Sequence, residues 1–311
     1  MPTYRLVLAA TCLMAAVAAG CGAVRAEKAS SPPPRTAARP PRPMPDPALA
    51  GCDLGPDRLA ELGATIRMAS VTTVYPHSPP NRNQNLVVAS RYLCGRVLAP
   101  GRTLSFNAAI GLTTRERGYT YGPTFVGDRV VPGMGGGVCQ VATTLYDAAR
   151  AAGIQVLERH AHGMRVPYVP PGEDATVSHP WLDLVIRNST AGPLVVAAVG
   201  QANRVTVSLY GTEAPPRTAF RHEILSTTPY PTLRIADPSL PRGREVTVQA
   251  GVDGTVAHTW YVVQRPGQPE RVYDLGIDRY RPSPHIIRYG VGTQADGATP
   301  ADKAKAGQAH P

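Results

Sequence analysis

Apolar residues recur at helical spacing in two segments of the chain. The first covers residues 85–97 and the second covers residues 139–152, after which Gly153 is a natural C-cap. The apolar positions on one face are Leu86, Ala89, Leu93 and Val97 in the first segment, and Val141, Leu145, Ala149 and Ala152 in the second. The spacing predicts one helix in each segment.

Beyond Gly153 the pattern changes to short runs rich in Val, Ile and Tyr, broken by Gly, Pro and Asn. Such runs are typical of strands. We expect strands at 154–157, 165–169, 183–187, 194–199 and 204–210, and short strands or loops at 105–111 and 119–122. Few helices and an antiparallel sheet indicate a compact α+β domain over residues 51–212.

A second unit is expected over residues 213–292. Its first part, up to Pro241, is rich in threonine and proline and has little helical pattern. Alternating segments at 244–251, 258–264 and 271–275 predict strands, with turn residues at 251–254. We therefore expect a small all-β domain, followed by a disordered polar tail at 293–311.

The N-terminus reads as an export signal. Residues 1–21 carry one arginine, then an apolar run, then small residues that end at Cys21. This end is similar to a bacterial lipobox, so we expect a lipidated Cys21 that anchors the protein to the membrane. The alternative is an ordinary signal cut near Ala26, which would give a secreted protein. Residues 22–50 are rich in Pro and Arg and predict an extended linker.

The chain of 311 residues has a formal net charge of +10 and is 43% hydrophobic, which is enough for a real core. The positive charge suits contact with anionic envelope surfaces. Zinc-finger spacing, aromatic RNA-binding motifs and a basic helix are all missing from the sequence, so we do not expect nucleic acid as a partner.

The cysteines indicate one disulfide and one free thiol. Export would place the folded part in an oxidising compartment, where Cys52, Cys94 and Cys139 remain once the signal region is set aside. We expect a Cys52–Cys94 bridge, which leaves Cys139 free.

The middle of the chain carries an ordered series of motifs, which are NRNQNLVVAS, LAPGRTLSFNAAIG, RGYTYGPTFVGDRVVPGMGGGVCQVATTLYDAA, ERHAHGMRVPYVPPGEDATV, DLVIRNST and VSLYG. This series resembles the VanW family of bacterial envelope proteins, which takes its name from a glycopeptide (vancomycin) resistance cluster. The β domain that follows is similar to a divergent G5 domain, a module associated with surface proteins and polysaccharide binding. The resemblance implies an extracytoplasmic protein that faces peptidoglycan, and it implies no particular reaction.

The residues themselves suggest cysteine chemistry. Cys139 follows the glycines Gly135, Gly136 and Gly137 and opens the second predicted helix, where backbone N–H groups and the helix dipole lower a thiol pKa. The same N–H groups and the Gln140 side chain are candidate donors to an oxyanion. A cysteine nucleophile also needs a histidine base and a group that orients it.

Downstream candidates supply these two roles. His162 matches the family pattern, with His160 as its neighbour, and Asp174 follows, next to Glu173. We expect Cys139, His162 and Asp174 to cluster as a catalytic triad that cleaves or transfers acyl groups of peptidoglycan stem peptides.

Two alternatives stay open. Cys139 is also the kind of small residue that fills a tight corner, and Arg159 can pair with Asp174 or Asp183 as a buried ion pair. The domain can equally be a non-catalytic wall-polymer binder, in which Gly135–Gly137, Gln140, Arg159 and Tyr119 contact the ligand and the G5-like domain adds affinity. We expect a monomer with no cofactor. We also expect no metal, because the sequence has no paired CxxC or HExxH motif.

Overall fold

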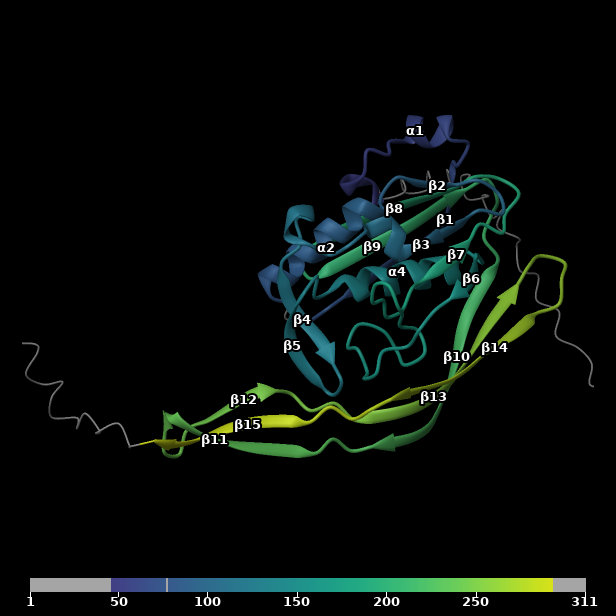
Figure 1. Cartoon of the computed structure of the whole chain (residues 1–311). Helices are drawn as coiled ribbons and strands as arrows, with labels where there is room; N and C mark the ends of the chain where they lie inside the picture. The colour runs from purple at the N-terminus through teal and green to yellow at the C-terminus, as the bar shows by residue number, and fades with distance from the viewer. Residues whose placement is uncertain (1–45, 77, 293–311) are drawn as a thin grey trace, which may run out of the picture. The chain divides into compact units, whose positions relative to one another are not determined.

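The computed structural model describes residues 46–76 and 78–292 (Figure 1). The signal region, the Cys21 lipidation site, the linker up to residue 45 and the tail from residue 293 lie outside the described residues. The first half of the described chain holds the 3-10 helices η1 (Leu49–Gly51) and η2 (Arg115–Arg117), the helices α1 (Pro56–Glu61), α2 (Pro80–Leu93), α3 (Phe106–Ile110) and α4 (Val138–Ala151), and the strands β1 (Ile66–Val74), β2 (Arg96–Leu98), β3 (Thr103–Ser105), β4 (Tyr121–Val126) and β5 (Arg129–Met134). The second half is all strand: β6 (Gln155–Glu158), β7 (Val185–Arg187), β8 (Leu194–Gln201), β9 (Arg204–Gly211), β10 (Arg217–Thr228), β11 (Thr232–Pro241), β12 (Glu245–Gln249), β13 (Gly254–Gln264), β14 (Arg271–Tyr280) and β15 (His285–Gly292).

Both predicted helices are present, with shifted ends. α4 agrees with its prediction to within one residue, whereas α2 begins at Pro80, five residues before the predicted start. A proline in the first turn suits this start, because its fixed φ matches the helix and its missing N–H is not needed there. α2 ends at Leu93 because Cys94 is extended and Gly95 has a φ of 79°. The prediction that the helix continues to Val97 was wrong, since β2 begins at Arg96.

The central layer is a four-stranded antiparallel sheet in the order β1-β9-β8-β2. Helices α2 and α4 pack together on one of its faces, α2 against β8 and α4 against β1 and β9. Side chains of β8 alternate between the two faces, so Val196 and Ala198 join the main core while Val195 and Ala197 face the other way. The sheet is therefore buried on both sides, which explains why β8 reads as a continuous apolar run.

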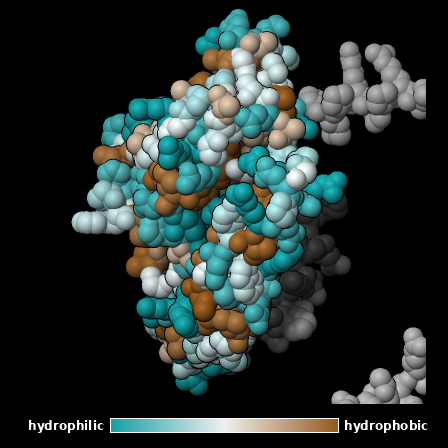
Figure 2. All heavy atoms as spheres, turned by 90° about the vertical axis from the view of Figure 1, so that its right-hand side faces the viewer, coloured by the Kyte–Doolittle hydropathy of each residue, from teal (hydrophilic) through white to brown (hydrophobic). Residues whose placement is uncertain are grey.

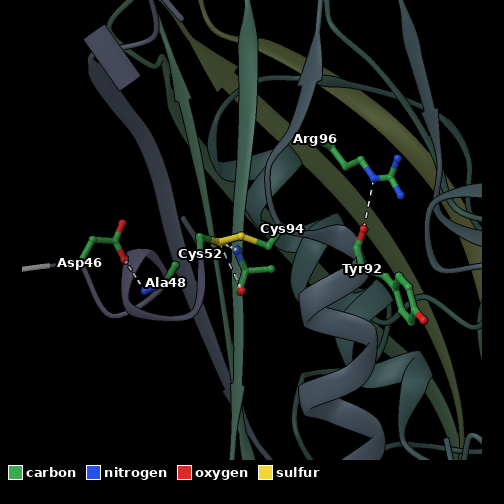
Figure 3. The surroundings of a disulfide bond; sticks show 7 residues. Asp46, Ala48, Cys52, Tyr92, Cys94 and Arg96 are labelled. Carbon is green, nitrogen blue, oxygen red and sulfur yellow. Dashed lines mark hydrogen bonds between the residues drawn. A yellow bond between two sulfur atoms is a disulfide. The ribbon is translucent and has the colours of Figure 1, made fainter. Parts of the chain in front are cut away.

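The segment before β1 covers the second face of the sheet. Leu54 and Leu59 pack there against Val195 and Ala197. Figure 3 shows the disulfide that ties this segment to the end of α2, between Cys52 and Cys94, whose Cα atoms lie 5.8 Å apart. The backbone N–H of Ala198 on β8 also donates to Cys52 Sγ at 3.3 Å. The bridge thus holds the N-terminal cover, the sheet and α2 together.

Some strands were predicted and others were not. The predictions at 154–157, 183–187, 194–199 and 204–210 correspond to β6, β7, β8 and β9. Residues 165–169 form no strand, because they belong to a turn-rich loop between β6 and β7. The pattern also missed β1 and the β4–β5 hairpin, and residues 106–110 form helix α3, capped by the Ser105 hydroxyl.

Strands β10–β15, here called the C-terminal module, form two three-stranded sheets. Their orders are β10-β13-β14 and β11-β15-β12, with β11 and β15 parallel and the other pairs antiparallel. The threonine- and proline-rich segment that gave no clear pattern contains the long strands β10 and β11.

On the face drawn in Figure 2, apolar side chains of the described residues gather in separate groups between polar ones.

The module contacts the α+β domain through specific side chains. The Tyr261 hydroxyl donates to the backbone oxygen of Arg150 at 2.6 Å, and Phe220 packs against Tyr146 of α4 with ring centroids 6.0 Å apart. At the tip of the β4–β5 hairpin, the Val130 N–H donates to Gln249 Oε1 at 3.0 Å. No helix in the described part of the chain has the length and apolar character needed to cross a bilayer.

We predict that replacing both bridged cysteines, Cys52→Ala with Cys94→Ala, lowers the free energy of unfolding by about 4 kcal/mol. The loop closed by the bridge spans 42 residues, and a cross-link of this length restricts the unfolded chain by about that amount. Urea unfolding of wild type and the double variant measures the difference. Cys139→Ala, which keeps the bridge, is the control; equal stability of the wild type with and without reductant would contradict the prediction.

Candidate functional site

At the glycine turn before α4, the backbone of residues 135–137 packs closely against the backbone of β4. Gly135 and Gly137 have φ values of 75° and 109°, in the left-handed region that disfavours other residues. A Cβ on Gly136 would lie 2.4 Å from the backbone carbon of Gly122 on β4. Three consecutive glycines are thus required by the fold, and they bring β4 against the start of α4.

Cys139 is the second residue of α4 and is partly exposed. Its sulfur lies 3.6 Å from the backbone oxygen of Val177 and 3.6 Å from the Thr176 hydroxyl. Within residues 46–76 and 78–292, the backbone N–H of Cys139 donates to no acceptor. A free thiol therefore sits beside an unused amide donor at a helix N-terminus, as the sequence led us to expect.

His162 and Asp174 lie together next to this thiol. His162 is 4% exposed and Asp174 is 1% exposed. The Oδ2 atom of Asp174 accepts from His162 Nδ1 at 2.6 Å and from the His162 backbone N–H at 2.7 Å. Because Asp174 engages Nδ1, the other ring nitrogen, Nε2, is the one available to exchange a proton with Cys139.

His162 Nε2 is buried and has no hydrogen-bond partner among the described residues. No hydrogen bond joins it to Cys139 Sγ, but both residues line the same cavity. Catalytic hydrogen bonds of unliganded enzymes are often long and tighten when substrate binds. His160, the alternative base, instead pairs with Glu158 at 2.9 Å and stays at the surface.

The charges of Cys139 and His162 depend on each other. Burial raises the pKa of the Cys139 thiol. The His162 imidazole and the contacts with Val177 and Thr176 lower this pKa by more than burial raises it, so its value is about 7. Burial lowers the pKa of His162, while the bond to Asp174 and the nearby Cys139 sulfur raise it to about 9. Between these values the thiolate and the imidazolium are present together, which is the reactive form of a cysteine nucleophile.

Asp174 is held by residues from two parts of the chain. Its Oδ1 atom accepts from Arg159 Nη2 at 3.0 Å and from the Tyr280 hydroxyl at 2.5 Å. Arg159 Nη1 also donates to Asp278 at 2.6 Å, so the C-terminal module supplies two of the groups around Asp174. Burial raises the pKa of Asp174, but the bonds from His162, Arg159 and Tyr280 outweigh it, so its pKa is lowered and it stays ionised.

The cavity beside Cys139 has a volume of about 890 Å³. Gly135, Gly136 and Gly137 line one part of it, and Phe125 and His162 meet edge to face with ring centroids 5.9 Å apart. Its size suits a small ligand or a short peptide segment. Within the described residues, no group of three or more His, Cys, Asp or Glu side chains is placed to hold a metal ion.

Three predicted binding residues have side chains that the fold buries or engages, although Gln140 is among the residues that line this cavity. Gln140 is fully buried, and its Nε2 donates to Thr73 in β1, so its amide cannot serve as an oxyanion donor. Tyr119 is 2% exposed and stacks on Tyr92 inside the core. Arg159 is engaged by Asp174 and Asp278, and the alternative pairing with Asp183 is wrong, because Asp183 binds Ser105 and Asn107.

Sequence reasoning missed Tyr280 and Arg82. Tyr280 lies at the end of β14, 106 positions from Asp174, and no local pattern marks it. Arg82 lines the cavity from the first turn of α2 although it is only 3% exposed. The sequence offered one sign of Arg82, its position in NRNQN near the start of a helix. A cation is unfavourable at a helix N-terminus, so its presence there points to a separate role.

Comparison with known proteins finds two family matches along the chain. Residues 81–210 match the family model described as VanW like protein, and residues 222–291 match the G5 domain. The chain carries a VanW domain followed by a G5 domain. The cysteine site lies in the VanW domain, while Tyr280 and Asp278 belong to the G5 domain. Both families are those of extracytoplasmic cell-envelope proteins.

Two curated relatives match parts of the chain. The uncharacterized protein YoaR of Bacillus subtilis is 34% identical over 48% of this chain and 50% of its own length. The vancomycin B-type resistance protein VanW of Enterococcus faecalis is 30% identical over 35% of this chain and 42% of its own. The chain thus spans about half of the length of each relative or less. A solved G5 domain of an IgA1 protease is 18% identical over 27% of this chain and all of its own, with a TM-score of 0.17.

We predict that alkylation of Cys139 accelerates as the pH rises through about 7, where the thiolate forms. In His162→Ala the imidazolium is lost and burial dominates, so the midpoint should move up to or beyond the usual thiol value of about 8.5. Iodoacetamide rates, with the adduct located by peptide mass spectrometry, measure both midpoints. His160→Ala is the matched control and should keep the wild-type midpoint; an unchanged midpoint in His162→Ala would refute the pairing.

We predict that Tyr280→Phe destabilises the protein by about 1–3 kcal/mol and slows Cys139 alkylation at neutral pH. The change removes the hydroxyl that donates to Asp174 and that accepts the Gly172 N–H at 2.7 Å, which leaves two buried polar groups underbonded. Thermal unfolding and alkylation rates test this. Tyr273→Phe on the same strand, where the tyrosine is 46% exposed, is the control, and equal effects of the two variants would count against the role of Tyr280.

Proposed function

We propose that this protein is a cell-envelope enzyme that cleaves or transfers the acyl group of peptidoglycan stem peptides through a thioester at Cys139. The observation that carries the proposal is the buried His162–Asp174 pair: His162 Nε2 has no partner among the described residues, and His162 and Cys139 line the same cavity. A nucleophile, a base and a group that orients the base are the minimum for this chemistry.

In the first step the Cys139 thiolate attacks a peptide carbonyl carbon. The developing oxyanion accepts a hydrogen bond from the backbone N–H of Cys139 at the start of α4, which has no other acceptor among the described residues. The C–N bond then breaks, His162 Nε2 gives its proton to the leaving amine, and the acyl group remains on sulfur as a thioester. Asp174 keeps the imidazole in the orientation and tautomer that this proton transfer needs.

In the second step an acceptor attacks the thioester. The acceptor is an amine of another stem peptide, which gives a cross-link, or water, which gives hydrolysis. His162 Nε2 takes the proton of the attacking group, the C–S bond breaks, and the thiolate–imidazolium pair is restored. The substrate assignment rests on the VanW and G5 domains, while the reaction class rests on the site itself.

The protein is further proposed to be anchored by a lipid at Cys21 and to act as a monomer. A wall-polymer binder without catalysis is the competing function. The exposed Trp181, which is 81% accessible and follows the cavity residues Ser178 and His179, favours contact with a sugar ring in either case.

We predict that incubation with synthetic stem peptides yields a mass adduct at Cys139, and that its rate is highest between about pH 7 and pH 9. Thiolate formation raises the rate up to the first value, and loss of the imidazolium proton lowers it above the second. Cys139→Ala should give no adduct, and Asp174→Asn should slow its formation by about 10³-fold or more, as in other triads.

The control is His160→Ala, which should react as wild type does. Co-sedimentation with purified peptidoglycan, run in parallel, separates the two functions. If the protein binds the polymer but forms no adduct at any pH, the enzyme proposal is rejected and the protein is a wall-polymer binder.

A further inference from the structure

The cavity next to Cys139 is positively charged. Its lining includes Arg82, Arg279 and Arg281, and none of the lining residues is Asp or Glu. In the described residues, none of these three arginines forms an ion pair, although eleven such pairs are present elsewhere. A cavity of one sign attracts a ligand of the other.

Arg82 is the most unusual of the three because it is buried without an ion pair to any described Asp or Glu. It is 3% exposed, and its only side-chain hydrogen bond to a described residue runs from Nη1 to the Ser78 hydroxyl at 3.2 Å. The guanidinium lies 3.9 Å from the centroid of the Tyr75 ring. A guanidinium has five N–H donors, so most of them are unused. Burying such a cation is costly unless an anion joins it.

The place of Arg82 ties it to the nucleophile. A Cβ on Gly137 would meet Arg82 Cγ at 2.8 Å, so the arginine stem crosses the glycine turn two residues before Cys139. The Cys139 charge acts on the Arg82 guanidinium, and burial lowers the pKa of that group. The Cys139 sulfur contacts the Thr176 hydroxyl and the Val177 backbone oxygen, and no hydrogen bond joins it to Arg82 among the described residues, so the arginine donors remain available to another anion.

We infer that Arg82 binds a carboxylate of the acyl donor, with Arg279 and Arg281 of the G5 domain at the outer edge of the same subsite. This inference rests on the proposed function and names its substrate more closely: a peptide with a free carboxylate near the scissile amide. Arginine suits the role because its planar fork pairs with both oxygens of a carboxylate.

The test measures binding and does not need turnover. In a Cys139→Ala background, calorimetry compares a synthetic stem tetrapeptide that has a free C-terminal carboxylate with the same peptide as its C-terminal amide. We expect the acid to bind at least about tenfold more tightly than the amide, as charge-assisted hydrogen bonds of this kind allow. Arg82→Gln should remove the preference, and Arg82→Lys should restore part of it.

Arg91→Gln is the matched control, because Arg91 is exposed on the same helix and outside the cavity. If Arg82→Gln fails to fold, Arg279→Gln with Arg281→Gln, both at exposed positions, carries the test and should weaken the preference by severalfold. A preference that survives in these variants, or equal binding of acid and amide, overturns the subsite. An adduct at Cys139 from both peptides alike would uphold the enzyme without the subsite, while preferential binding without any adduct would uphold the subsite without the enzyme.

Discussion

The buried carboxylate of Asp174 is the group on which the rest of the site depends. It accepts four hydrogen bonds, two from His162, one from Arg159 and one from Tyr280. A carboxylate that is 1% exposed is stable only when it is paired and fully bonded. The residues that satisfy Asp174 are the same ones that fix the imidazole, so stability and chemistry share a single network.

This network makes the G5 domain part of the site. Tyr280 contacts Asp174 directly, and Asp278 holds the other end of Arg159. The Arg281 N–H also donates to the Gly163 oxygen at 2.7 Å, one residue after His162. The G5 domain therefore also positions the base of the reaction that we propose.

The glycine run before Cys139 has a steric reason that is independent of catalysis. Gly136 allows β4 to touch the start of α4, and Gly137 leaves room for the Arg82 stem. The same close packing brings the thiol, an open amide and a buried cation to one cavity wall. A tight corner and a thiol of lowered pKa are thus compatible accounts of Cys139, because the residues of the corner help to lower its pKa to about 7.

Local patterns in the sequence predict the helix that carries Cys139, the strands β6 to β9 and the Cys52–Cys94 bridge, and they nominate Cys139, His162 and Asp174 as a triad. These predictions depend on local periodicity, on turn chemistry and on an ordered series of motifs. What surrounds these residues depends on contacts between segments that are far apart in the chain. Gln140 is a core residue because α4 is buried on nearly every side, so helical spacing does not tell which face meets a ligand. Tyr119, which precedes β4, is a core residue because it stacks on Tyr92. Tyr280, Asp278 and Arg82 reach the site from distant strands and helices, and the free energy that holds them there comes from long-range burial and charge pairing, which leave no local pattern in the sequence.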